Sequence, residues 1–117
     1  MKFEEPLVSV ILPTYNRAHL IEKSIKSVLD QTFTNFELLI VDDGSDDNTE
    51  NVVKNIDDPR IKYIKCRENK GANVARNIGI DTAQCNYIAF QDSDDEWYTD
   101  KLEKQGSAMQ EASPLIG

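Results

Sequence analysis

Short β-branched segments and amphipathic helical segments alternate along the chain, and this alternation limits the possible folds more than any other feature. Such an order predicts an α/β fold in which parallel strands are joined by right-handed helical crossovers. The expected strands are 7–12, 36–41, 61–65 and 87–91, and the expected helices are 18–31, 46–56, 71–83 and a last one that begins near Thr99.

Three local features add detail to this fold. Pro13 cannot continue a ladder of hydrogen bonds, so the first strand is expected to end at residue 12. The alternating pattern in 61–65 predicts a half-exposed strand at an edge of the sheet. On the third helix, Ala75, Gly79 and Ala83 form a face of small residues that lets the helix lie close to the sheet. We therefore expect a Rossmann-like parallel sheet sandwiched by helices.

Length, charge and cysteine content exclude several classes of protein. With 117 residues, we expect one domain over 1–117, at a length where a three-layer α/β domain is only partly built. The 21 acidic and 13 basic residues give a net charge of −8, which argues against a nucleic-acid partner. The apolar run near the start is too short for a signal peptide or membrane span. Cys66 and Cys85 lack the spacing of a zinc site and are expected to be free thiols.

Polar clusters directly follow three of the expected strands. "PTYNR" follows the first strand, "DDGSDDN" the second and "DSDDEW" the fourth. In open parallel sheets, ligands bind beyond the carboxyl ends of the strands, where the strand order reverses. We therefore expect the three clusters to share one rim and to form one ligand site.

The cluster "DSDD" places two carboxylates, Asp92 and Asp94, two positions apart. Such a pair at a strand end can bind one hard cation, Mg²⁺ or Mn²⁺, when substrate phosphates complete its ligands. A nucleoside diphosphate would repel these carboxylates by about 4 kcal/mol per charge pair about 4 Å apart at an effective dielectric of about 20, so a divalent cation would be required. The alternative is a solvated turn or a helix cap, which Asp and Ser also form.

The cluster after the second strand offers an acceptor for a nucleoside. Asp42 or Asp43, before a glycine turn, can accept a hydrogen bond from a base N–H or a ribose hydroxyl. The alternative is that Asp43, Ser45 and Asp46 cap the following helix. We expect different residues of this cluster to serve the two purposes.

The cluster "PTYNR" after the first strand offers an aromatic ring and polar groups that can bind a nucleoside. Tyr15 can lie against a planar base, and the Thr14 hydroxyl and Asn16 amide can bind polar edges. Arg17 either meets phosphate or stays solvated.

The segment "NKGANVARN" holds the local concentration of positive charge that points toward this rim. It contains Lys70 and Arg76, with Asn77 beside them. We identify Arg76 as the best candidate for offsetting diphosphate charge or for supporting the Asp loop.

In this order and spacing, the motifs resemble the amino-terminal half of a family 2 glycosyltransferase with the GT-A nucleotide-diphospho-sugar transferase fold. The resemblance covers about residues 7–105 and rests on "VSVILPTYNR", "FELLIVDDGSDDNT", "NKGANVARNIGI" and "YIAFQDSDD". It implies that a sugar passes with inversion from a nucleotide-sugar donor, usually a UDP-sugar, to the hydroxyl of a sugar, lipid or protein acceptor.

The resemblance also implies roles by motif position. Asp43, with Asp42 as the alternative, would bind the uracil edge, and Arg76 would support the phosphates. Pro13, Thr14 and Tyr15 would border the base. The full set of implied donor-binding residues is Pro13, Thr14, Tyr15, Asn16, Arg17, Asp42, Asp43, Arg76, Asp92 and Ser93.

For the metal, the resemblance implies Asp94 as the ligand of Mn²⁺ or Mg²⁺. Asp92 would bind ribose or share the metal, and Asp95 is the alternate ligand. One departure from the family pattern is Gln91, where an apolar residue is more common. Gln91 either hydrogen-bonds the nucleotide or simply ends the strand.

The general base of such an enzyme, usually an Asp or Glu on a later strand or loop, is expected beyond residue 117. Residues 1–117 are therefore expected to be a donor-binding fragment of a longer transferase, one that binds UDP and metal weakly and transfers no sugar alone. The family by itself implies a cytoplasmic location, or a peripheral one at the cytoplasmic face of the membrane.

Three rival functions are weighed against this interpretation. A non-catalytic nucleotide-binding module, or a degenerate transferase domain, would share every loop described above. A phosphotransfer receiver domain needs an Asp after the third strand, where this chain has Cys66. A phosphatase with an aspartate nucleophile needs D-x-D after the first strand, and a sugar nucleotidyltransferase needs a glycine-rich basic loop there; the chain has "PTYNR".

Overall fold

The computed structural model describes residues 8–32, 34–85 and 87–91. All four described strands are parallel and lie in the order β3-β2-β1-β4. The helix expected from Thr99 lies outside the described residues. The strands are β1 (Val8–Thr14), β2 (Phe36–Asp42), β3 (Ile61–Lys65) and β4 (Tyr87–Phe90), and the helices are α1 (Ile21–Leu29), α2 (Thr49–Lys54) and α3 (Ala72–Thr82).

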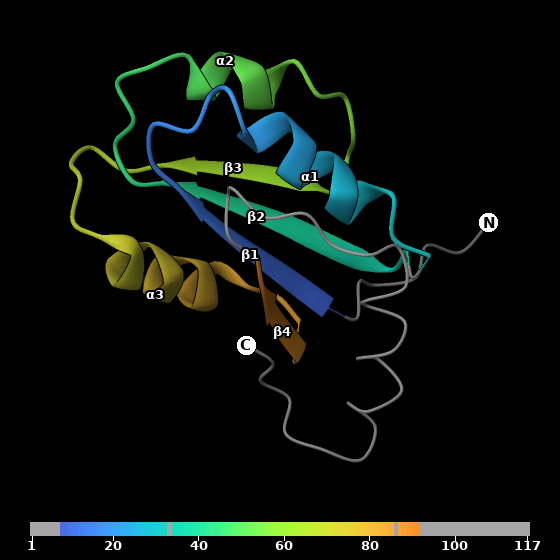
Figure 1. Cartoon of the computed structure of the whole chain (residues 1–117). Coiled ribbons are helices and arrows are strands. Elements are labelled where there is room, and N and C mark those ends of the chain that lie inside the picture. Colours follow the sequence, from blue (N-terminus) through green and yellow to red (C-terminus); the bar gives the residue numbers. More distant parts are fainter. Residues whose placement is uncertain (1–7, 33, 86, 92–117) are drawn as a thin grey trace.

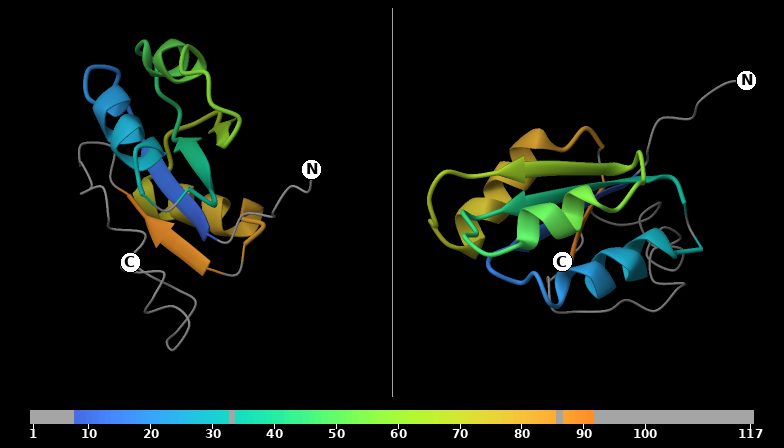
Figure 2. Two further views of the ribbon diagram at one scale, coloured as in Figure 1. Left: turned by 90° about the vertical axis from the view of Figure 1, so that its right-hand side faces the viewer. Right: turned by 90° about the horizontal axis from the view of Figure 1, so that it is seen from above.

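Helices cover both faces of the sheet, as the alternation predicted. Helices α1 and α2 lie on one face and α3 on the other (Figures 1 and 2). None of the helices in the described part of the chain has both the length and the apolar character needed to cross a bilayer. The apolar core on the α1 and α2 side comprises Val8, Val10, Leu12, Ile21, Ile25, Val28, Phe36, Leu38, Ile40, Val53 and Ala89.

The prediction that β1 ends before Pro13 is wrong, because β1 continues to Thr14. The O atom of Ile11 accepts from Gln91 N on the β4 side, and the O atom of Thr14 accepts from Asp43 N on the β2 side. Since backbone groups alternate in direction along a strand, the nitrogen of Pro13 faces β4. The last paired residue there is Phe90, opposite Ile11. The missing N–H of the proline therefore costs no hydrogen bond to β2.

Two other predictions about packing are confirmed. Strand β3 lies at an edge of the described sheet, with Lys62 and Lys65 exposed and its other three residues half-buried. On α3, Ala75 and Gly79 of the small face are buried, whereas Ala83 follows the helix and is half-buried. A Cβ atom on Gly79 would lie 2.6 Å from Cγ2 of Ile11, so α3 crosses β1 at a distance that only glycine allows there.

The first two helices begin later than their apolar periodicity predicted. Helix α1 begins at Ile21 and α2 at Thr49, each three residues after the expected start. The residues before each helix form hydrogen bonds between loops instead, for example from Ala18 N to Asp47 Oδ2 (3.2 Å). Such bonds give the backbone an alternative to helical hydrogen bonding. The spacing of apolar residues contains no information about them.

A buried polar network, which the sequence did not suggest, lies at the amino ends of the strands. The Glu37 carboxylate, with a side chain only 4% exposed, accepts hydrogen bonds from Ser9 Oγ (2.6 Å), Lys62 Nζ (2.8 Å) and Gln84 N (2.9 Å). Burial alone would raise the pKa of Glu37, but the bonds from Lys62, Ser9 and Gln84 outweigh burial and lower it. The network joins three strands to the segment that links α3 to β4.

Candidate functional site

The carboxyl ends of β1, β2 and β3 meet at one edge of the sheet, on the left of Figure 1. Three segments leave the strands there, and we name them loop A (15–20), loop B (43–48) and loop C (66–71). The segment that follows β4 lies outside the described residues. The predictions for Asp92, Ser93, Asp94 and Asp95 therefore stay predictions.

Loops A and B are joined into one unit. Four hydrogen bonds connect loop A to loop B and the start of α2: Asn16 N to Ser45 Oγ (2.8 Å), Asp46 N to Asn16 Oδ1 (3.0 Å), Arg17 N to Thr49 Oγ1 (3.2 Å) and Ala18 N to Asp47 Oδ2 (3.2 Å). Asn16 has φ of 50°, a left-handed conformation that is uncommon for a residue other than glycine. Its two bonds to loop B hold it in that conformation.

The two neighbouring aspartates at the end of β2 have different surroundings. Asp42 is fully buried, and its Oδ1 accepts from Ser45 N (2.8 Å) while its Oδ2 accepts from the Tyr63 hydroxyl. Burial, and then the adjacent Asp42, raise the pKa of Tyr63 above its usual value, so that Tyr63 stays a neutral donor. Both oxygens of Asp42 are thus committed to internal partners.

Asp43 holds loop C in place. Its Oδ1 accepts from Lys70 N (2.9 Å) and its Oδ2 from Gly71 N (2.8 Å). Each carboxylate oxygen has a second lone pair, so Asp43 keeps acceptor capacity for a ligand after these two bonds. Unlike Asp42, Asp43 also lines a pocket.

Gly44 allows loops B and C to approach one another. It has φ of +81°, and a Cβ atom there would lie 2.8 Å from the backbone carbon of Glu68 and 2.9 Å from the nitrogen of Asn69. The glycine turn that the sequence placed after Asp43 is thus a point of contact between two backbones.

The pocket beside Asp43 has a volume of about 430 Å³. Loop C forms one wall and the first turns of α3 form the other. Burial, and then the negative charges of Asp43 and Asp42, raise the pKa of the Cys66 thiol. A pocket with an apolar helix wall and acidic acceptors from Asp43 and Glu68 suits a flat heterocycle that carries an N–H group. The lining residues are Asp43, Cys66, Arg67, Glu68, Lys70, Val74 and Ile78.

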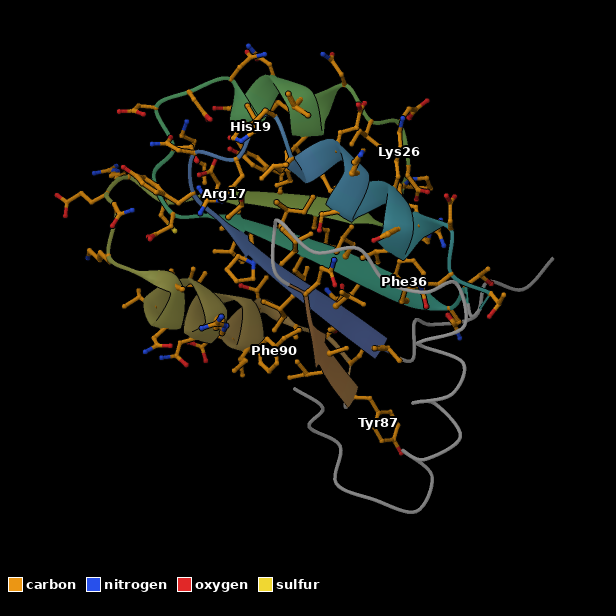
Figure 3. The ribbon with its side chains drawn as sticks, viewed as in Figure 1. Arg17, His19, Lys26, Phe36, Tyr87 and Phe90 are labelled. Carbon is orange, nitrogen blue, oxygen red and sulfur yellow. The ribbon has the colours of Figure 1, made fainter. Side chains whose placement is uncertain are left out.

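The residues predicted from "PTYNR" lie at the same edge. Pro13 and Thr14 are buried, whereas the side chain of Tyr15 is 40% exposed. The Thr14 hydroxyl is buried and has no hydrogen-bond partner within the part of the chain that the structure describes. Arg17 is exposed, and Figure 3 shows it at the carboxyl edge of the strands. Buried hydroxyl groups nearly always form a hydrogen bond. The Thr14 hydroxyl at the end of β1 can therefore form one with a polar group of a ligand.

Arg76 lies on α3 but not among the residues that line the pocket. Its Nη1 donates to Asn73 Oδ1 (3.2 Å) on the same helix. Lys70 does line the pocket and is held by its backbone bond to Asp43. The structure therefore brings together Thr14, Asp43 and Lys70 at one edge and leaves Arg76 on the neighbouring helix.

Gln91 has a buried side chain that contacts α1. Its Nε2 donates to Ser24 Oγ (2.9 Å), and its backbone N–H donates to Ile11. Of the two roles weighed for Gln91, these contacts favour that of ending the strand.

The described residues do not assemble a metal site by themselves. Among residues 8–32, 34–85 and 87–91, no three His, Cys, Asp or Glu side chains are grouped so as to hold a metal ion. The residues predicted to bind Mn²⁺ or Mg²⁺, Asp92 and Asp94, lie outside the described residues.

Several residues of this site were not identified from the sequence. Tyr63 was assigned only to a half-exposed strand, and Cys66 only to a free thiol. Cys66 directly follows β3, so the rule that selected the ends of the other strands would also have selected it, whereas Tyr63 lies in the middle of β3. The contributions of Val74 and Ile78 depend on how α3 lies against the sheet, which no local pattern specifies.

Comparison with known proteins places these features in a family. The family model for glycosyl transferase family 2 matches residues 9–116. TuaG of Bacillus subtilis (strain 168) is 49% identical over 111 residues, which are 93% of this chain and 44% of that protein. The UDP-Glc:alpha-D-GlcNAc-diphosphoundecaprenol beta-1,3-glucosyltransferase WfgD of Escherichia coli is 49% identical over 106 residues, 91% of this chain and 42% of that protein. The chain thus spans less than half the length of these relatives.

Solved structures share the fold. S. aureus TarS 1-349 in complex with UDP-GlcNAc matches with a TM-score of 0.84 and 30% identity, over 90% of this chain and 31% of that one. The mannosyltransferase PcManGT of Pyrobaculum calidifontis, in complex with GDP-Man and Mn²⁺, matches with a TM-score of 0.81 and 27% identity, over 91% of this chain and 33% of that one. The two complexes differ in nucleobase, so this fold accommodates both uracil and guanine.

Proposed function

The chain belongs to the glycosyl transferase family 2, and on this premise we propose that it binds the donor when a sugar passes from a nucleotide sugar to an acceptor hydroxyl. The proposed donor is a UDP-sugar and the proposed outcome is inversion. One observation carries the proposal: Asp43, at the end of β2, both anchors loop C and lines a 430 Å³ pocket. Its spare lone pairs suit the N–H of a uracil edge.

The other roles follow the same geometry. We assign Pro13, Thr14 and Tyr15 to the border of the base, since they end the strand next to β2. Asp42 is reassigned from the base to the support of loop B, because its side chain is fully buried and does not line the pocket. Arg17 and Arg76 are proposed to meet the diphosphate, together with the side-chain NH2 group of Asn16.

The metal and the acceptor complete the proposal. Asp94, with Asp92, is proposed to bind Mn²⁺ or Mg²⁺, and Ser93 to contact the donor; a divalent ion would stabilise the diphosphate as it leaves. The name of WfgD specifies a lipid-linked saccharide acceptor, and we propose an acceptor of that kind, used at the cytoplasmic face of the membrane. Because the chain spans less than half of its relatives, we assign no general base within it.

Titration of the purified chain with UDP, GDP and CDP tests this proposal. With Mn²⁺ present, we expect UDP to bind at least about tenfold more tightly than GDP or CDP, since a wrong base leaves buried polar groups unpaired. The preference should require the metal and should be lost in Asp94→Ala. Equal binding of all three nucleotides without metal would contradict the proposal.

The two cysteines provide a test of where the base binds. Cys66 lines the pocket, whereas Cys85 lies at the opposite edge, with its Sγ 3.9 Å from Glu37 Oε2. Burial raises the pKa of both thiols, so each is labelled with iodoacetamide at about pH 8.5, and its labelling rate with UDP is compared with its own rate without UDP. At a UDP concentration of about ten times Kd, labelling of Cys66 should slow about tenfold and that of Cys85 should not change. Mass spectrometry of the labelled peptides measures both, and equal labelling with and without bound UDP would place the base elsewhere.

A further inference from the structure

Asp42 is a fully buried carboxylate with no ion pair among the described residues. A buried charge without a cation is costly unless hydrogen bonds satisfy its oxygens. Each oxygen of Asp42 accepts one hydrogen bond: Oδ1 from the backbone N of Ser45 (2.8 Å) and Oδ2 from the Tyr63 hydroxyl. An apolar residue would cost less free energy to bury at this position. We therefore look for a role of the carboxylate other than packing.

The bonds of Asp42 continue into the two loops of the candidate site. Ser45, held by Asp42, accepts at Oγ from Asn16 N (2.8 Å). Asn16 in turn accepts at Oδ1 from Asp46 N (3.0 Å). An unbroken series of hydrogen bonds therefore runs from the middle of β3, through the end of β2, to loop A.

The last member of this series controls a backbone direction. Asn16 has φ of 50°, a left-handed conformation that is uncommon for residues with a Cβ atom, although asparagine adopts it more readily than most. Tyr15 and Arg17, the residues on either side, leave the chain in directions that depend on it. If Asn16 relaxed to an ordinary conformation, both side chains would move.

We propose that Tyr63 is a positioning residue for donor binding, because its hydroxyl, acting through Asp42 and Ser45, holds Asn16 in the conformation that directs Tyr15 and Arg17. The inference rests on the proposed function of the site, and it assigns to β3 a role that the loops alone do not reveal. Tyr63 itself does not touch the pocket. The Tyr63 hydroxyl donates to Oδ2 of Asp42 and so fixes the carboxylate in the orientation in which Oδ1 accepts from Ser45 N.

Removal of this one hydroxyl tests the proposal. In Tyr63→Phe, Oδ2 of Asp42 is left buried without a donor, and rotation of the carboxylate to find one releases Ser45 N. We expect UDP and uridine to bind about tenfold more weakly, by the same factor, because the loss lies on the side of the nucleoside. Hydrogen exchange at Ser45 N and Asn16 N should accelerate, while Ile40 N in the middle of β2 should keep its protection.

Tyr87→Phe is the matched control. It removes a tyrosine hydroxyl from the first residue of β4, far from Arg17 in Figure 3. Nucleotide affinity and exchange at Ser45 and Asn16 should stay as in the unaltered chain. A conservative rescue is also available: adding Asp42→Asn to Tyr63→Phe removes the unsatisfied charge and keeps an oxygen for Ser45 N. That double variant should recover UDP affinity to within about threefold of the original.

The outcomes separate this inference from the proposed function. If the unaltered chain binds no nucleotide but Tyr63→Phe still accelerates exchange at Ser45 and Asn16, the network stands and the proposed function fails. If UDP binds and Tyr63→Phe changes neither UDP affinity nor hydrogen exchange, Tyr63 does not position Asn16 and the inference is wrong. Exchange that accelerates equally throughout β2 would show general destabilisation and would also overturn the inference. If Tyr63→Phe does not fold, Ser45→Ala can be used instead, because it removes the bond from Asn16 N to Ser45 Oγ. Unchanged UDP affinity in Ser45→Ala would also overturn the inference.

Discussion

Replacing Asp43 by asparagine is expected to weaken UDP binding about 100-fold. The substitution keeps the shape of the side chain, but an amide nitrogen cannot accept a hydrogen bond. Either Lys70 N or Gly71 N then loses its acceptor, and the base faces a neutral group instead of a carboxylate. A hydrogen bond to a charged group contributes about 1.5–3 kcal/mol, so loss of the bond to the base alone raises Kd by a factor of about 10 to 150, and the loosened loop C keeps the expected factor in the upper part of that range. Calorimetric titration measures the change directly.

Asp46→Asn is the control for this variant. Asp46 is exposed and lies in the same loop, but loop A uses its backbone N–H, which the substitution leaves in place. Its affinity for UDP should stay within about twofold of the original, since exposed carboxylates contribute little. The assignment of Asp43 would be wrong if Asp43→Asn bound UDP normally, or if both variants lost affinity equally.

Glu37→Gln should have the largest effect on stability, far from the candidate site. Removing the charge leaves Lys62 without its counterion and replaces one acceptor oxygen by an NH2 donor, which then faces the donors of Lys62 or of Ser9 and Gln84. Breaking a fully buried pair costs about 3–5 kcal/mol. Because Lys62 is 44% exposed and can be rehydrated, we expect the free energy of unfolding near pH 7 to fall by about 2–4 kcal/mol. Urea denaturation measures this difference.

The pH dependence of the same variant tests the origin of its effect. Hydrogen bonds lower the pKa of Glu37 in the folded chain below its ordinary value of 4.5. Between these two values the unfolded chain binds more protons, so stability rises with pH in that window. The contribution of Glu37 is therefore complete above 4.5 and is lost as pH falls through the lowered pKa. The stability difference between the original chain and Glu37→Gln should shrink with it, and a difference that is constant with pH would contradict the prediction.

Glu22→Gln is the control for Glu37. Glu22 pairs with Lys26 on the surface of α1 at 3.6 Å, and both side chains are more than half exposed. A surface pair at this helical spacing contributes about 0.3–0.5 kcal/mol. Its loss should change stability by no more than that, with little dependence on pH.

Local patterns in the sequence were sufficient for the order of elements and for the edge that carries the polar loops. Period-two and helical spacings reflect which face of each element is buried, so they locate strands and helices even without contacts. They misjudged Pro13, because the cost of a proline depends on which neighbour its nitrogen faces, and that direction is set by pairing with β4.

The roles of the two adjacent aspartates could not be told apart from the sequence. Asp42 ends β2 and Asp43 directly follows it, so their side chains point in opposite directions. One meets Tyr63, which lies 21 residues on along the chain, and the other meets Lys70 and Gly71. Which face offers a hydroxyl from β3 and which offers a pocket beside α3 is a property of packing.

The sequence by itself determined the α/β alternation, the parallel direction of the strands and the meeting of their polar ends at one edge. These follow from chain connectivity and side-chain periodicity, which are local properties. Which acidic group is buried as a support and which faces the pocket depends on the tertiary structure, as do the parts played by Tyr63 and Glu37. Such assignments depend on contacts between segments distant in sequence, and hydrogen bonding and close approach exist only once those segments are packed together.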